Sequence, residues 1–289
     1  ELLLECGDGV VLQAFHASPA KCGREPGKTL AVLLHGWEGS ADSTYVLSVA
    51  QTLFERDFEV VRLNLRDHGT THHLNRDLFH SCLLPEVVGA VLSLAQRFAN
   101  LPIVLVGFSL GGNFMLRVAA DREARDLPLQ RVLAVSPVLD PAVTMTTLER
   151  GSPLYHGYFV RKWTRSLAKK QLAWPDHYNF DDLLRIRSLR EMTRQLVERH
   201  TEYPSMDDYL AGYAITGDRL TTLAAPATVL TSLDDPIIEA RDLARLARSP
   251  RLDIVTTAHG GHCGFLENLG GSNWVDTLLV KLLSHNPDR

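Results

Sequence analysis

One serine in this chain occupies a setting that could make it a nucleophile. Ser109 lies in the segment Gly107-Phe108-Ser109-Leu110-Gly111, which fits the pattern G-x-S-x-G. An apolar run precedes this segment and an apolar helical pattern follows from Phe114, so the segment is predicted to be a sharp turn between a buried strand and a helix. Such a turn strains the serine backbone, requires small neighbours and leaves the hydroxyl exposed at a helix N-terminus. We therefore expect Ser109 to take part in covalent catalysis.

A serine hydroxyl needs a base within reach, and the base needs an acid to orient it. When the nucleophile lies in a strand–turn–helix segment of this kind, the acid and the base are expected later in the chain, in that order, after two further strands. The apolar run Ala227–Leu230 is followed by two candidates for the acid, Asp234 and Asp235. The last strand is followed by His259 and His262. His262 lies between glycines that allow close backbone approach, so it is the predicted base, whereas His259 is expected to have a structural role.

The tetrahedral intermediate of such a reaction carries a negative oxygen that two N–H groups must stabilise. One donor is expected from Leu110, the residue after the nucleophile, and the other from the loop after the first long buried strand. That loop begins with His35-Gly36-Trp37, so the N–H of Trp37 is the predicted second donor. A plain turn at the end of the strand is the alternative for this His-Gly pair. A serine mechanism of this kind requires no cofactor.

A second group of reactive side chains lies in the loop from Arg66 to Cys82, which holds four histidines. Histidine, aspartate and cysteine are all zinc ligands, so a metal site is conceivable there. The spacings match neither H-E-x-x-H nor a pair of C-x-x-C motifs, and no metal is predicted. His72 and Asp77 also fit an H-x4-D pattern linked to acyl transfer, but two residues at that spacing recur by chance. We expect this loop to be structural and to lie near the mouth of the site.

Strands and helices alternate along most of the chain. The segments Leu2–Glu5 and Val10–Phe15 predict a β-hairpin, and the all-apolar run Leu30–Leu34 predicts a strand that is covered on both faces. Further strands are predicted around residues 59–64, 103–106, 132–135, 227–230 and 253–256, and helices around residues 45–54 and 87–98. This alternation predicts an α/β fold with a mostly parallel central sheet between layers of helices.

The alternation breaks between residues 141 and 223, where no convincing strand occurs. Helical patterns such as Tyr158–Leu172 and Phe180–Val197 take its place. The predicted organisation is therefore a core of residues 1–140 and 224–289, with a helical cap of residues 141–223 inserted between two strands of the sheet.

The composition is ordinary for a globular protein, with 45% hydrophobic and 22% charged residues. A net charge of −4 and basic residues scattered along the sequence argue against a nucleic-acid partner. No apolar run approaches the roughly 18 to 20 residues of a membrane span, and no signal peptide is recognisable. The four cysteines form no C-x-x-C pair and are expected to be free thiols, with two disulfides as the alternative. We expect a cytoplasmic protein, although the chain begins at Glu1 and a preceding segment remains open.

The chain resembles the YheT-like group of the α/β-hydrolases, also called AB-hydrolase-4, over almost its whole length. The resemblance rests on the segments that match motifs of the group. These are the turn after the first buried strand, the loop with an arginine and the aromatic-His-Ser segment after the next strand, the turn with the nucleophile, and the loops with the acid and the histidine. In this sequence the matching segments are His35–Ser40, Asn64–Gly69, Phe79–Ser81, Gly107–Asn113, Leu148–Gly151, Asp234–Pro236 and Gly260–Phe265. One departure is Asp67, where the group usually has a glycine, and it leaves the shape of that loop open.

The resemblance implies an α/β-hydrolase fold and a catalytic triad of Ser109, Asp235 and His262. Asp235 is favoured because an Asp-Pro step is the usual register of the acid in such hydrolases, and Asp234 is the alternative. The implied reaction is hydrolysis of carboxylic esters, of acylglycerols or of other short- to medium-chain acyl esters, through an acyl-enzyme on Ser109. The alternatives are acyl transfer to an alcohol by the same residues and a non-catalytic binding scaffold. The expected partner is therefore a small-molecule or lipid ester, with no metal and no nucleic acid.

Overall fold

A mixed β-sheet forms the centre of the protein in the computed structural model, which describes residues 1–99, 101–265 and 273–284. Within these residues eight strands pair in the order β1-β2-β4-β3-β5-β6-β7-β8. The strand β2 is antiparallel to both of its neighbours, and every other pair of neighbours is parallel. The strands are β1 (Leu2–Glu5), β2 (Val11–Ala17), β3 (Leu30–Leu34), β4 (Glu59–Leu63), β5 (Ile103–Phe108), β6 (Leu129–Val135), β7 (Ala227–Ser232) and β8 (Leu252–Thr257).

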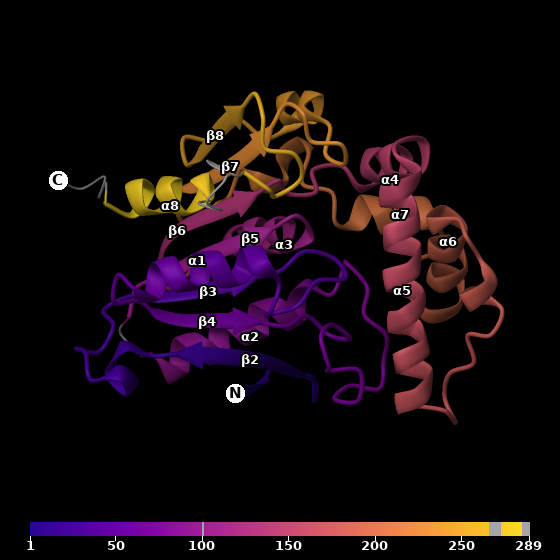
Figure 1. The fold of residues 1–289 in the computed structure, drawn as a ribbon, viewed down its shortest axis with the longest axis horizontal. Coiled ribbons are helices and arrows are strands. Elements are labelled where there is room, and N and C mark those ends of the chain that lie inside the picture. Colours follow the sequence, from indigo (N-terminus) through magenta and orange to yellow (C-terminus); the bar gives the residue numbers. More distant parts are fainter. Residues whose placement is uncertain (100, 266–272, 285–289) are drawn as a thin grey trace.

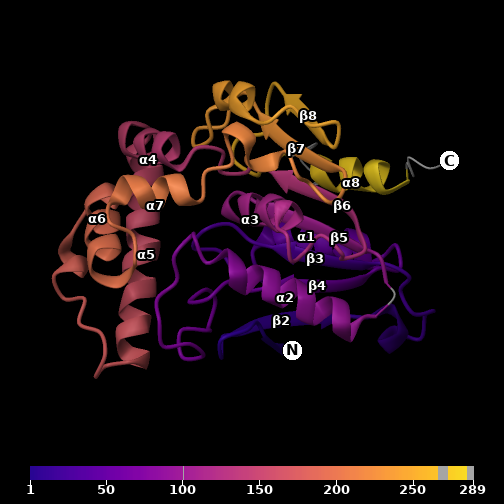
Figure 2. The same cartoon turned by 180° about the vertical axis from the view of Figure 1, so that it is seen from behind.

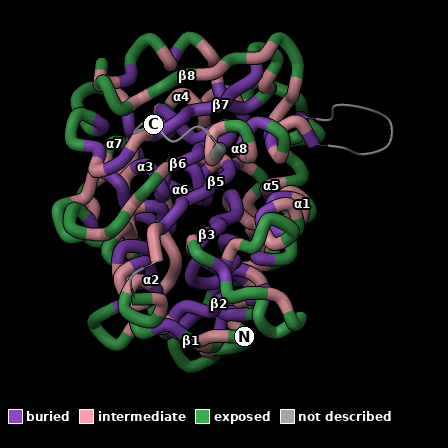
Figure 3. Tube along the Cα trace, turned by 90° about the vertical axis from the view of Figure 1, so that its left-hand side faces the viewer, coloured by how far each residue is buried: buried purple, intermediate pink, exposed green. Residues whose placement is uncertain are grey.

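Helices cover both faces of this sheet. One face carries α1 (Thr44–Phe54) and α8 (Trp274–Ser284), and the other carries α2 (Leu84–Arg97) and α3 (Leu110–Ala120), as Figures 1 and 2 show from opposite sides. Every residue of β3 and β5 is buried because both of their faces are covered, and the burial is visible along the middle of the molecule in Figure 3. The predicted fold class is confirmed.

Four α-helices lie between β6 and β7 and stand together at one end of the sheet. The strands β3 and β4 point toward the longest of them, α5 (Figure 1). The helices are α4 (Pro141–Arg150), α5 (Pro153–Ala173), α6 (Leu189–His200) and α7 (Met206–Gly212). In α/β folds the carboxyl ends of the strands are where ligands bind, so these helices cover the edge of the sheet that is suited to a site.

The helix predicted for residues 180–197 is wrong in its first half. The structure has a short 3-10 turn, Leu183–Arg185, and α6 begins only at Leu189. The break follows from capping, since the hydroxyl of Ser188 accepts a hydrogen bond from the N–H of Glu191 at 3.2 Å and starts a new helix. Phe180 is fully buried before the turn, so its apolar character reflects core packing and not helical periodicity.

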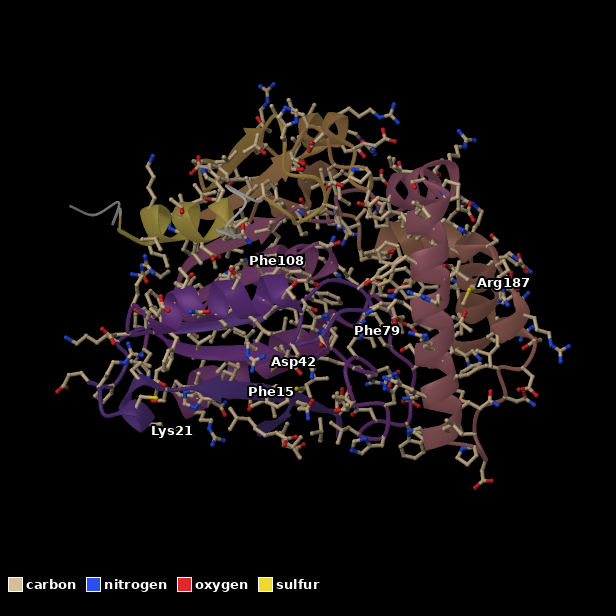
Figure 4. The ribbon with its side chains drawn as sticks, in the orientation of Figure 1. Phe15, Lys21, Asp42, Phe79, Phe108 and Arg187 are labelled. Carbon is tan, nitrogen blue, oxygen red and sulfur yellow. The ribbon has the colours of Figure 1, made fainter. Side chains whose placement is uncertain are left out.

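A buried lysine ties α5 to the loop that precedes α2. The Nζ atom of Lys170 donates to Asp67 Oδ1 at 2.8 Å and to the backbone oxygens of Asn75 and Asp77 at 2.7 and 3.0 Å. Asp67 has φ of 57°, in the region that favours glycine, and its second oxygen accepts the N–H of Phe79 at 2.9 Å. Phe79 itself lies between the core and α5 (Figure 4). The Asp67 carboxylate therefore fixes the loop and joins it to α5.

Two further observations concern the described residues as a whole. None of their helices combines the length and the apolar character needed to cross a membrane. The four cysteines all lie among them and are free thiols.

Candidate active site

Ser109 occupies the sharp turn between β5 and α3. Its backbone angles are φ 51° and ψ −118°, a combination that residues other than glycine rarely adopt. The turn is held by a 2.8 Å hydrogen bond from the N–H of Ser109 to the carbonyl of Val135. The helix α3 begins immediately afterwards at Leu110, four residues earlier than the apolar pattern indicated, so the side chain of Ser109 stands at a helix N-terminus.

The glycines around Ser109 are required by close backbone contacts. A Cβ atom at Gly107 would lie 2.3 Å from the carbonyl oxygen of Gly111, and one at Gly111 would lie 2.4 Å from the carbonyl oxygen of Leu34. Real Cβ atoms do not approach other atoms so closely. The two glycines of G-x-S-x-G therefore let α3 start directly against β3 and β5, which places the serine between them.

His262 and Asp235 approach Ser109 from two loops at the same edge of the sheet. His262 lies in the loop after β8, and its Nε2 is 2.9 Å from Ser109 Oγ. Asp235 lies in the loop after β7, and its two carboxylate oxygens are 2.9 and 3.1 Å from His262 Nδ1. The structure thus brings together, within hydrogen-bonding distance, the three residues that the sequence singled out for the nucleophile, the base and the acid.

The carboxylate of Asp235 is surrounded by donors. Its side chain is 0% exposed, and its Oδ1 accepts the backbone N–H groups of Ile237 and Ile238 at 2.9 and 3.0 Å. These bonds offset the cost of burying a carboxylate. An acceptor at Nδ1 favours the tautomer that carries its proton there, which leaves the lone pair of Nε2 facing Ser109.

Asp234, the alternative acid, has other partners. Its Oδ1 accepts the N–H of Gly261 at 2.8 Å, and its Oδ2 is 3.3 Å from His259 Nδ1. The bond from Gly261 is the main reason why the pKa of the Asp234 carboxyl lies below its usual value. Asp234 therefore stabilises the loop that carries His262, and the exposed ring of His259 contacts the carboxylate of Asp234.

Leu110 and Trp37, the two predicted donors to an oxyanion, flank the serine. Leu110 is the first residue of α3, and the first N–H groups of a helix have no partner within it. The positive end of the helix dipole lies at the same point. Trp37 lies in the loop after β3 and shares one cavity with Ser109 and His262.

A buried histidine orients the peptide that contains the N–H of Trp37. His35 Nδ1 donates to the carbonyl of Gly36 at 2.7 Å, and the same carbonyl accepts the N–H of Gly39 at 3.0 Å. Because the peptide is planar and trans, the N–H of Trp37 points away from that carbonyl. Burial lowers the pKa of His35 to about 3, so the ring is neutral and its Nε2 accepts the N–H of Leu65 at 3.2 Å. No role was predicted for His35, although a histidine directly after an all-apolar strand is a signal of one.

Three adjoining cavities surround these residues. The first, of about 330 Å³, is lined by Ser109, His262, Trp37 and several cap residues. The second, of about 100 Å³, is lined by Leu110 and again by Trp37, and the third, of about 60 Å³, extends further under the cap. Lining residues shared by the first two cavities are Trp37, Val138, Thr144 and Leu148, and those shared by the last two are Phe79, His80, Trp163, Thr193 and Tyr209.

Glu38 borders the first and the third of these cavities and was not among the predicted site residues. Burial raises the pKa of its carboxyl to about 8, because the charged form is desolvated. The nearby lysines, Lys162 and Lys169, oppose this effect only in part. This shift favours the protonated form of the Glu38 carboxyl, which lies one residue away from the predicted donor Trp37.

Two of the four histidines in the loop between β4 and α2 make structural contacts. His72 Nε2 is 2.9 Å from Ser166 Oγ on α5, and His68 Nδ1 donates to the carbonyl of Arg66 at 2.7 Å. Across residues 1–99, 101–265 and 273–284, no group of three or more His, Cys, Asp or Glu side chains could hold a metal ion. The contacts of His72 join this loop to the cap.

Comparison with known proteins gives a consistent result. The sequence model described as "Alpha/beta hydrolase family" matches residues 31–269. The "Putative esterase YheT" of Escherichia coli is 28% identical over 92% of this chain and 77% of that protein, which confirms the predicted resemblance to the YheT-like group. The "Monoacylglycerol lipase" of Saccharomyces cerevisiae is 22% identical over 91% of this chain and 60% of that protein.

A solved structure shares the fold at low sequence identity. Est1E from Butyrivibrio proteoclasticus, described with bound ferulic acid, superimposes with a TM-score of 0.65 at 17% identity, and the match covers 100% of both chains. At this identity the likeness concerns the fold alone.

Proposed function

We propose that this chain, which belongs to the alpha/beta hydrolase family, hydrolyses carboxylic esters with Ser109 as its nucleophile. The observation that carries the proposal is the unbroken series of hydrogen bonds from Ser109 Oγ through the ring of His262 to the buried carboxylate of Asp235. The names of the relatives YheT and monoacylglycerol lipase support ester hydrolysis as the reaction class. The chain spans only 60% of the yeast lipase, so its specific substrate belongs to the proposal as well.

In the first half of the reaction Ser109 Oγ attacks the ester carbonyl while His262 Nε2 accepts the hydroxyl proton. The carbonyl oxygen becomes an oxyanion that the N–H groups of Trp37 and Leu110 stabilise. Asp235 stabilises the imidazolium and keeps its Nδ1–H in place. Collapse of the intermediate breaks the ester C–O bond, and the proton on Nε2 passes to the departing alcohol. The product is an acyl-enzyme on Ser109.

In the second half a water molecule gives a proton to His262 Nε2 and attacks the acyl carbonyl. The same two N–H groups stabilise the second oxyanion. Collapse returns the proton to Ser109 Oγ and releases the carboxylic acid. Every proton is handled by His262, so the reaction needs no cofactor.

The cavities suggest where each part of the substrate lies. The departing alcohol must face His262, which borders the cavity of about 330 Å³. The acyl carbonyl must contact the N–H of Leu110, and Leu110 is one of the residues that line the cavity of about 100 Å³ beneath α4. We therefore assign the acyl chain to the two inner cavities under the cap. Their small volumes support short- to medium-chain acyl esters as the substrate class.

The test is hydrolysis of p-nitrophenyl esters from acetyl to palmitoyl by the wild type and by Ser109→Ala, with labelling by a fluorophosphonate. We expect kcat to fall by about 10⁴-fold or more in Ser109→Ala, and labelling to vanish. Circular dichroism checks that the variant is folded. If the folded wild type neither labels nor turns over any ester, the proposal fails and a non-catalytic scaffold takes its place.

The placement of the acyl chain has a separate test. Met145 lines the inner cavity of about 100 Å³, so Met145→Trp is expected to lower kcat/KM for octanoyl esters while that for acetyl esters is retained. Met206→Trp is the matched control, because Met206 is also partly buried but lies in a separate cluster on α7. An equal loss for acetyl and octanoyl esters in Met145→Trp would contradict the placement.

A further inference from the structure

The outer side of α5 carries a continuous stripe of exposed residues. They recur every three or four positions, which places them on one face of the helix. The members of this α5 stripe, all of them exposed, are Leu154, Tyr158, Arg161, Arg165, Lys169 and Leu172. The opposite face of α5 packs inward, where Phe159 and Trp163 contact Trp37 with ring centroids 5.4 and 5.1 Å apart. The stripe is therefore the free face of an amphipathic helix.

The charge of α5 is unusual for this chain. The helix contains Arg161, Lys162, Arg165, Lys169 and Lys170 and no acidic residue, although the chain as a whole has a net charge of −4. Basic residues are thus concentrated on α5, whereas those in the rest of the sequence are scattered. Lys170 is buried and paired with Asp67. Lys162 and Lys169 donate to the backbone oxygens of Glu38 and Gly69 at 3.4 and 3.2 Å, whereas Arg161 and Arg165 are exposed.

The two arginines in the middle of the stripe lack acidic partners. Neither Arg161 nor Arg165 forms an ion pair with any carboxylate in the described part of the chain. The neighbouring helix α6 differs, because Arg194 on its surface is paired with both Glu191 and Glu198. The positive charge of Arg194 on α6 is therefore neutralised locally, whereas that of Arg161 and Arg165 on α5 remains available to an anionic partner.

A groove extends this positive surface around the cap. Arg161 and Arg165 border it together with Arg187 and His156, and its volume is about 390 Å³. Arg187 lies on the outer side of the cap (Figure 4). No carboxylate is among the described residues that line the groove.

Exposed apolar side chains stand at both ends of the stripe. Leu154 is 84% exposed and Leu172 is 81% exposed, and their positions place them on the same line along the helix. Tyr158 adds an aromatic ring with a polar end, a side chain suited to the boundary between water and lipid. Leucines at the ends and basic residues between them are the pattern of a helix that lies flat on an anionic lipid surface.

The stripe also reaches the opening of the large cavity. Tyr158 is exposed on the stripe and lines the cavity that contains Ser109, as does the exposed Tyr155 beside it. A surface that covered the stripe would therefore lie against the entrance to the candidate active site.

We propose that the α5 stripe docks on an anionic lipid surface and brings the opening of the Ser109 cavity against it. The basic side chains are attracted to the negative headgroups, and Leu154 and Leu172 enter the boundary between headgroups and acyl chains. Docking does not depend on the proposed ester hydrolysis. It would give that reaction direct access to ester lipids.

The test is sedimentation of the protein with sucrose-loaded vesicles of equal parts phosphatidylcholine and phosphatidylglycerol. We expect binding that is absent with phosphatidylcholine alone and that weakens at high salt, where screening shortens the range of electrostatic attraction. Arg161→Glu with Arg165→Glu is expected to weaken the binding at least about tenfold. Leu154→Ser with Leu172→Ser removes the apolar ends and is expected to weaken it several-fold.

Matched controls place the same changes elsewhere on the surface. Arg56→Glu with Arg125→Glu reverses two exposed arginines of the core, and Leu3→Ser removes an exposed leucine of β1. Both are expected to bind like the wild type. Ser109→Ala should also bind fully, and the stripe variants should hydrolyse the soluble ester p-nitrophenyl butyrate at the wild-type rate. The two proposals can therefore fail independently.

Two outcomes would overturn the proposal. One is a failure of the vesicle experiment: the wild type does not bind anionic vesicles, or the stripe variants bind as well as the wild type, or the control variants lose as much binding as the stripe variants. The other is binding to immobilised polyglutamate, dependent on Arg161 and Arg165, without binding to vesicles. That result would assign the stripe to an acidic protein segment.

Discussion

Two aspartate–histidine pairs lie side by side after β7 and β8, and their surroundings differ. The side chain of Asp235 is 0% exposed and meets His262 at 2.9 Å. The side chain of Asp234 is 44% exposed and meets His259, which is 90% exposed, at 3.3 Å. The same two residue types are thus combined once inside the protein, within reach of Ser109, and once at its surface.

The comparison shows that partners and burial decide what such a pair can do. Asp235 has two backbone donors and an imidazole as partners, and its side chain is shielded from solvent, so its position is fixed and its charge acts on His262. Asp234 accepts from the backbone of Gly261 and Gly260 and from the side chain of Ser232, and its histidine partner is solvated. Solvent screens the second pair, and its main effect is to hold the backbone of the His262 loop.

Asp235→Asn is expected to have the largest effect among the changes that separate the two pairs. The amide no longer stabilises the imidazolium and can bind the wrong tautomer of His262, so kcat should fall by about 10³- to 10⁴-fold. The measurement is hydrolysis of p-nitrophenyl butyrate, with KM expected to stay near its wild-type value. Asp234→Asn is the control, and a larger loss in this variant than in Asp235→Asn would reverse the assignment of the acid.

A third carboxyl sharpens the comparison, because Glu38 is half-buried and lacks the donors that Asp235 has. No hydrogen bond to its carboxylate is present among the described residues, and burial raises its pKa to about 8 from 4.5. Between these pH values the folded state binds more protons than the unfolded state, so the free energy of unfolding falls as pH rises. For one proton the slope is at most about 1.4 kcal/mol per pH unit.

Glu38→Gln is expected to remove this part of the pH dependence. The variant should therefore gain stability relative to the wild type as pH rises from about 5 to about 8. Urea unfolding of both proteins across that range measures the difference. Curves that stay parallel would show that Glu38 has an ordinary pKa, and that burial without donors is not what distinguishes it from Asp235.

Much of the framework behind these pairs could be predicted from the sequence, because its signals are local. The run Leu30–Leu34 is apolar throughout since β3 is covered on both faces, and its predicted bounds agree with the structure. The turn at Ser109 was predictable because the backbone passes so close to Gly107 and Gly111 that neither position can accommodate a side chain. The resemblance to the YheT-like group then favoured Asp235.

The remaining features depend on contacts between distant segments. Asp234 and Asp235 are adjacent, and only the folded turn after β7 decides which carboxylate faces inward. The burial of Glu38 depends on the cap, and the break before α6 depends on the capping hydroxyl of Ser188. The role of Asp67 likewise required its partner Lys170, 103 residues away. Patterns within one segment carry little information about such pairings.

Asp234→Ala tests the bracing role of the exposed pair. The variant loses the acceptor for the N–H of Gly261, next to His262, so that loop should hold the imidazole less firmly against Ser109. We expect kcat to fall several-fold, about tenfold at most, because only partly solvated hydrogen bonds are lost. The rate with p-nitrophenyl butyrate measures this effect. A loss as large as that of Asp235→Asn would mean that bracing and orientation cannot be separated.

His259→Ala is expected to have the smallest effect, and it isolates the exposed histidine from the loop. The ring is almost fully solvated and its 3.3 Å contact with Asp234 is long, so side-chain entropy and solvent screening offset what the contact contributes. Asp234 keeps its bond to Gly261 in this variant, and the loop should therefore stay in place. We expect kcat for p-nitrophenyl butyrate to change by no more than about twofold.

His262→Ala is the matched variant three residues along, where loss of the base should lower kcat by about 10³-fold or more. If the two alanine variants lost activity equally, burial would not be the property that separates the two pairs.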